Sequence, residues 1–139
     1  METDPMIVRR TCVVLALLCA ADLAEAGCGW YLLVPPQGRY DEKAPFLQGI
    51  KILMDSPLSK WNHQGSYESA EVCETVKASQ VRMEHSVYDK SKDHYMRLLG
   101  AKEDPKALSV QRYLTERNSA NVDALIAARC VTSDDPRLR

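Results

Sequence analysis

An apolar run near the N-terminus most constrains the fold, because it decides how much of the chain is left to form one. Arg9 and Arg10 are followed by eleven uncharged residues, from Thr11 to Ala21, before Asp22 interrupts the run. A membrane-spanning helix needs about 20 such residues, so the run is too short to span. A basic start, an apolar middle and small residues after it are the pattern of an export signal.

Two cleavage sites follow this run and predict different mature proteins. Signal peptidase I would recognise Ala24-Glu25-Ala26 and leave Gly27 first. Lipoprotein signal peptidase would cut before Cys28 and leave a lipid-bearing cysteine; the Ala-Gly-Cys triplet resembles the end of a bacterial lipobox. Glu25 stands where that motif usually has an aliphatic residue. We predict a signal peptide over residues 1–27 and lipid on Cys28, with cleavage after Ala26 as the alternative.

The cysteines help to weigh these two cleavages. Cys12 and Cys19 leave with the signal, so the mature chain keeps Cys28, Cys73 and Cys130. An exported protein sits where disulfides persist. If Cys28 carries lipid, Cys73 and Cys130 remain as a pair with no thiol left over, whereas cleavage after Ala26 leaves one thiol free or joined to another chain. We favour lipid on Cys28 and a disulfide between Cys73 and Cys130.

The size and charge of the chain exclude few classes of protein. The chain has 18 basic and 19 acidic side chains, a balance that gives no long-range attraction to nucleic acid. Removal of residues 1–26 leaves 113 of the 139 residues, enough for one small domain to which a covalent staple would matter. Met6 is an alternative start, because it shortens the signal to a basic segment without Glu2 and Asp4.

The first part of the mature chain reads as extended or irregular. Trp30 to Val34 is apolar and is ended by Pro35-Pro36, which cannot continue a helix. In a strand, one side would carry Trp30, Leu32 and Val34 and the other Tyr31 and Leu33. We expect residues 28–60 to form a tether and an irregular or extended segment.

The rest reads as helical. Ser66 suits an N-cap, and Tyr67, Ala70, Cys73 and Val76 recur at three-residue spacing, which puts Cys73 on a buried face. A second, short helix is expected to end at Gly100. A further helix is expected to begin with Asp104 as N-cap and Pro105 in the first turn. We expect it to break at Asn118 to Asn121, before a last helical stretch from Val122 to Ala128. The predicted fold class is a mainly α, small single domain of a few helices over residues 61–139, stapled by one disulfide.

Several stretches together resemble a known group of proteins. They are Cys28 to Pro36 (CGWYLLVPP), Trp61, Gly65 to Cys73 (GSYESAEVC) and Cys130 to Leu138 (CVTSDDPRL). This combination is similar to a group of small, uncharacterised bacterial exported proteins, many of them predicted lipoproteins. The resemblance implies a disulfide between Cys73 and Cys130 and a location in the bacterial envelope, and it implies no activity.

Motifs for chemistry are missing from the sequence. His63, His85 and His94 stand in no zinc or haem spacing, and phosphate-binding loops and nucleophile elbows are absent. We therefore predict no catalytic residues, no metal site and no cofactor. Two charged stretches have side chains of the kind that bind metals or ions, but an ordinary surface or turn is the favoured interpretation of both: Glu84, His85, Asp89, Asp93 and His94, and the run Asp134-Asp135-Pro136-Arg137.

These observations favour a non-catalytic, lipid-anchored envelope protein with a structural or protein-interaction role. Its partners would be the membrane, through lipid on Cys28, and an envelope protein, with no nucleic acid. Gly29 after the cysteine resembles the pattern of lipoproteins that are retained in the outer membrane, and we expect the protein to face the periplasm. The alternative is a soluble periplasmic or secreted binding module. An enzyme is the least expected outcome, and a deep pocket that combines His63, His85 or His94 with carboxylates would support it.

Overall fold

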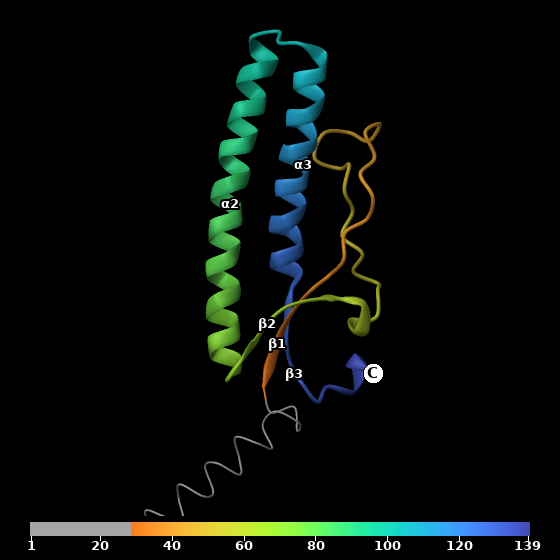
Figure 1. Cartoon of the computed structure of the whole chain (residues 1–139), viewed down its shortest axis with the longest axis vertical. Coiled ribbons are helices and arrows are strands. Elements are labelled where there is room, and N and C mark those ends of the chain that lie inside the picture. The colour runs from red at the N-terminus through yellow and green to blue at the C-terminus, as the bar shows by residue number, and fades with distance from the viewer. Residues whose placement is uncertain (1–28) are drawn as a thin grey trace, which may run out of the picture.

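The computed structural model describes residues 29–139, in which two long helices project from a small sheet (Figure 1). The antiparallel sheet has the strand order β2-β1-β3. The predicted signal peptide of residues 1–27 and Cys28 lie outside the described residues. The elements are β1 (Trp30–Val34), β2 (Asn62–Tyr67), α2 (Ala70–Gly100), α3 (Pro105–Ala127), β3 (Arg129–Thr132) and two short 3-10 helices, η1 (Leu58–Lys60) and η2 (Pro136–Leu138).

A mainly helical chain with one disulfide is confirmed, and the three-stranded sheet was not predicted. The predicted N-cap at Ser66 is wrong, because the backbone of Ser66 pairs with Tyr31 in the sheet. Ser69 caps α2 instead, and its side chain accepts a hydrogen bond from the Val72 amide at 3.2 Å. The helix therefore begins three residues later than the sequence signal placed it.

Both helices run without interruption. The division of residues 70–100 into two helices is wrong, since α2 is continuous over 31 residues. It does end at Gly100, and the left-handed residue that follows is Lys102, with φ of 54°. The start of α3 at Asp104 and Pro105 is confirmed, with the Asp104 side chain accepting from two first-turn amides. The predicted break at Asn118 to Asn121 is wrong, because this part of α3 packs against the rest of the fold and buries Ala120.

β1 is the central strand and is covered on both faces. Leu32 and Val34 pack with Cys73 and with the end of α3, and Trp30 joins them on that side. Leu33 lies in a second cluster on the other side, where Tyr31 joins it. The predicted alternation along β1 is therefore confirmed. The remaining buried members are Ala124, Leu125 and Ala128 in the first cluster and Leu58, Trp61 and Val131 in the second.

The disulfide between Cys73 and Cys130 joins the first turn of α2 to β3. Cys73 is fully buried and is the one buried residue of α2. Hydrogen bonds join the middle of the helix pair: the Ser91 and Thr115 hydroxyls lie 3.0 Å apart, and Gln111 donates to the Ser91 carbonyl at 3.2 Å. The bond therefore supplies cohesion at the base of a hairpin that has few buried apolar contacts of its own.

Replacing both Cys73 and Cys130 with alanine should lower the free energy of unfolding by about 4 kcal/mol, because the bond closes a loop between residues 57 apart in sequence. Urea unfolding followed by circular dichroism measures the change. The unreduced wild-type chain, once denatured, should show no reactive thiol from this pair. Two reactive thiols there would contradict the pairing.

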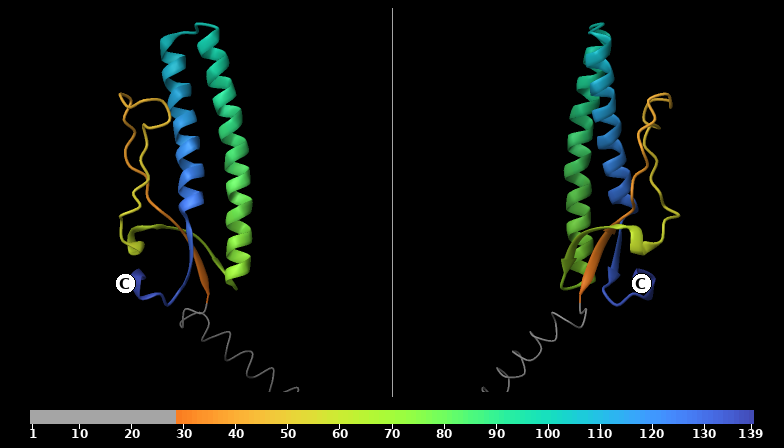
Figure 2. Two further views of the ribbon diagram at one scale, coloured as in Figure 1. Left: turned by 180° about the vertical axis from the view of Figure 1, so that it is seen from behind. Right: turned by 45° about the vertical axis from the view of Figure 1, so that its right-hand side comes forward.

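The segment between β1 and η1, residues 35–57, lies along α3 in all three views (Figures 1 and 2). It is held by Glu116 of α3, which is 2% exposed and accepts hydrogen bonds from the Gly49 amide at 2.7 Å and from Arg112 Nε at 2.8 Å. Arg112 also donates to the Ala44 carbonyl. The hydrogen bond to Glu116 raises the pKa of Arg112 above its ordinary value. Residues 35–57 are thus joined to α3 by hydrogen bonds of Gly49 and Ala44 to an ion pair whose carboxylate is buried.

Gly49→Ala should destabilise the protein by about 1–3 kcal/mol, because a Cβ at Gly49 would lie 2.2 Å from Glu116 Oε2 and 2.6 Å from the Tyr40 ring. The matched control is Gly100→Ala at the end of α2, where a Cβ meets nothing within 4 Å. That change should be neutral or stabilising, since alanine favours a helix by up to about 1 kcal/mol. Equal melting temperatures for the two variants would contradict this account of Gly49.

Candidate functional site

The three histidines lie in different surroundings. The His63 ring on β2 has its centroid 4.5 Å from that of the Tyr31 ring, and its Nε2 lies 3.2 Å from the Ser66 hydroxyl. His85 pairs with Asp89 at 3.1 Å on the exposed surface of α2. His94 lines a shallow groove near the far end of the hairpin. Within residues 29–139, no group of three or more His, Cys, Asp or Glu side chains is placed to hold a metal ion.

The acidic run near the C-terminus forms a turn, as predicted. The Asp135 side chain accepts from the Arg137 amide at 2.9 Å and so caps η2. Its other oxygen pairs with the Arg137 guanidinium at 2.7 Å. These hydrogen bonds from Arg137 lower the pKa of Asp135 to about 2. The Asp135 carboxylate thus stabilises its own turn by accepting hydrogen bonds from Arg137.

The sheet end of the molecule is the part nearest the predicted lipid site. Gly29 is the one residue between Cys28 and β1, and its carbonyl accepts from the Ser133 amide at 2.9 Å. The helices extend away from this end (Figure 1). At 1.5 Å per residue, the 31 residues of α2 span about 46 Å. A group attached at Cys28 would therefore sit close to the sheet and far from the hairpin turn.

One side of the hairpin exposes apolar side chains, and we call it the hairpin flank. On α2, Met83 and Val87 are 60% and 48% exposed; on α3, Val110 and Leu114 are 54% and 39% exposed. Val87 and His94 are seven residues apart and share a helix face, and His94 lines the same groove as Val110, so the four side chains lie on one flank. Exposed apolar groups in one place mark interaction surfaces. Sequence reasoning missed this flank because it divided residues 70–100 between two helices.

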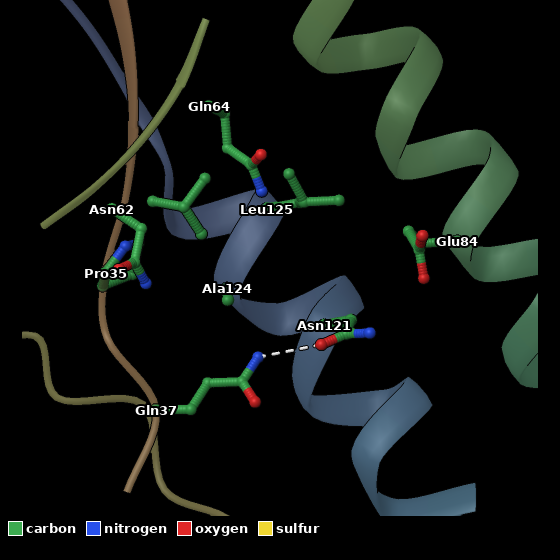
Figure 3. A pocket seen from close by; sticks show the side chains of 9 residues that line it. Pro35, Gln37, Asn62, Gln64, Glu84, Asn121, Ala124 and Leu125 are labelled. Carbon is green, nitrogen blue, oxygen red and sulfur yellow. Dashed lines mark hydrogen bonds between the residues drawn. The ribbon is translucent and has the colours of Figure 1, made fainter. Parts of the chain in front are cut away.

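A cleft of about 340 Å³ lies between the sheet and the base of the helices (Figure 3). Its polar residues come from four parts of the chain, and Gln37 Nε2 donates to Asn121 Oδ1 at 3.0 Å across it. Of these residues the sequence had singled out Glu84 alone, as a weak metal candidate. No local signal could have found the rest, because they meet only in the folded chain. The lining consists of Gln37, Asn62, Gln64, Glu84 and Asn121 with Val34, Pro35, Ala124 and Leu125.

Comparison of this chain with protein-family models, with curated proteins and with solved structures finds no match. Among the described residues, neither helix combines the length and the apolar character needed to cross a bilayer.

Proposed function

We propose that this chain is a non-catalytic, lipid-anchored protein of the bacterial cell envelope, with a structural or protein-interaction role. The observation that carries the proposal is the geometry at the two ends of the molecule. A lipid on Cys28 would be followed by Gly29 alone before the sheet begins, so the sheet would lie at the membrane surface. The hairpin would then stand off the membrane by a distance approaching the roughly 46 Å length of α2.

The disulfide and the hairpin flank support the same proposal. A disulfide suits a protein that leaves the cytoplasm, because disulfides persist in oxidising compartments. The flank that carries Met83 and Val110 offers apolar area to a partner protein at a height above the membrane. The residue after Cys28 is Gly29, and a residue of this kind at that position resembles the pattern of lipoproteins retained in the outer membrane, on the periplasmic side.

The alternative is a soluble periplasmic or secreted binding module, cut after Ala26. It keeps the same fold and disulfide, but Cys28 then carries a thiol in place of lipid. An enzyme remains the least favoured class of protein, because the sequence contains no recognised catalytic motif. The two leading proposals differ at Cys28, which makes that residue the target of the test.

The intact mass of the processed protein, taken without reduction from membrane and soluble fractions of a bacterial host, tests the anchor. We expect a membrane-bound species that begins at Cys28, carries acyl mass and is two hydrogens light for one disulfide. Cys28→Ala is the matched control and should abolish both the acyl mass and membrane retention. A wild-type soluble species that begins at Gly27 would refute the anchor and favour the binding module.

A photo-crosslinking residue tests the hairpin flank in the same host. Placed at Met83, it should give a discrete adduct with an envelope protein, identified by mass spectrometry, because Met83 is 60% exposed on the flank. Placed at Asp89, an exposed position on another face of α2, it should give none. Equal adducts from both positions, or none from Met83, would count against an interaction role for the flank.

A further inference from the structure

The cleft between the sheet and the hairpin is assembled for hydrogen bonding. Asn62 and Gln64 come from β2, Glu84 from α2, Asn121 from α3 and Gln37 from the segment after β1. Figure 3 shows Gln37, Gln64 and Asn121 grouped around the opening, with Glu84 on the facing helix. The volume of about 340 Å³ is at the small end of the range of roughly 300–1,000 Å³ for clefts that hold small molecules.

The polar groups of the cleft present both donors and acceptors. Each carboxamide has an NH₂ donor and a carbonyl acceptor. The bond between Gln37 and Asn121 uses one donor of Gln37 and accepts at Asn121 Oδ1, so Gln37 Oε1 and Asn121 Nδ2 remain for a ligand. Glu84, which is partly buried, adds a carboxylate that can accept two hydrogen bonds. Hydroxyl groups match this lining, since each hydroxyl donates one hydrogen bond and also accepts.

The charge and the apolar lining of the cleft limit further the chemical class of ligand that would fit. Glu84 is the one ionisable side chain among the nine that line it, and no lysine or arginine is there to hold a phosphate or carboxylate. Aliphatic groups of Val34, Ala124 and Leu125 also line the cleft and suit the C–H face of a saturated ring. No aromatic side chain lines the cleft to stack on a flat ligand. An uncharged, polyhydroxylated, non-aromatic molecule fits these features.

A peptide that adds as a strand fits less well. The register between β1 and β2 shifts between Leu32 and Leu33, so Gln64 is an additional residue between the paired positions His63 and Gly65. Such a bulge breaks the regular spacing of backbone groups that an added strand needs, and it redirects a side chain. The Gln64 side chain accordingly lines the cleft.

The geometry points to a saccharide-binding site: Gln37, Gln64, Asn121 and Glu84 bind the hydroxyl groups of an uncharged sugar unit, whose ring rests on Val34, Ala124 and Leu125. This inference depends on the cleft alone and holds for an anchored or a soluble chain.

Calorimetric titration of the purified, processed chain with two uncharged oligosaccharides, maltotetraose and the tetramer of N-acetylglucosamine, tests the site. At least one should bind. Glu84→Gln should weaken that binding about tenfold, because a hydrogen bond to a charged group is lost, and Gln64→Ala should weaken it about fivefold. Neither side chain makes a hydrogen bond to another described residue, so both variants should keep the wild-type melting temperature.

Matched controls are Glu74→Gln, on the exposed surface of α2, and Gln48→Ala, an exposed carboxamide outside the cleft. Both should bind the sugar as the wild type does. End-blocked tetra-alanine serves as the peptide probe and should not bind. Absence of binding by both sugars, sugar binding that the two cleft variants leave unchanged, or preferential binding of the peptide would each overturn the inference. Failure of the lipid-anchor test has no bearing on these outcomes.

Discussion

The disulfide between Cys73 and Cys130 is the constraint on which the rest of the structure depends. It joins the start of α2 to the strand that follows α3, so it holds both helices of the hairpin against the same sheet. The hairpin has little apolar contact of its own to do this, since α2 buries Cys73 alone and its middle meets α3 through hydroxyl and amide groups. A covalent link at the base lets the helices extend far beyond the core that supports them.

A second attachment holds residues 35–57 against the hairpin. The buried Glu116 accepts hydrogen bonds from Gly49 and Arg112, and two aromatic pairs, Tyr40 with Tyr113 and Phe46 with Tyr95, also join this segment to the helices. Burial of a carboxylate is costly unless the group is paired, and here both of its oxygens have donors. The same attachment keeps Gln37 within reach of Asn121, and so the packing of this segment also shapes one wall of the cleft.

The proposed roles use different parts of one fold. The sheet end follows the predicted lipid site directly, the hairpin flank offers apolar side chains above it, and the cleft lies between them at the base of the helices. A protein that sits on a membrane with its sheet could thus contact a partner protein with the flank and a sugar with the cleft. None of these sites requires a catalytic group, in keeping with the lack of any catalytic motif in the sequence.

The sequence by itself determined the features whose signals are contained in a few neighbouring residues. The alternation from Trp30 to Val34, the helix start at Asp104 and Pro105, and the turn at Asp135 and Arg137 are of this kind, and parity of the cysteines paired Cys73 with Cys130. Tertiary structure decided the rest. Ser66, which would suit a helix cap, lies in β2 because its backbone pairs with β1. Asn121 is helical in spite of its low helix propensity because its neighbours Ala120 and Val122 in α3 are buried. The cleft brings Gln37 to Asn121 across 84 residues, and no local pattern encodes such a meeting, because the free energy that favours it comes from packing of the whole fold.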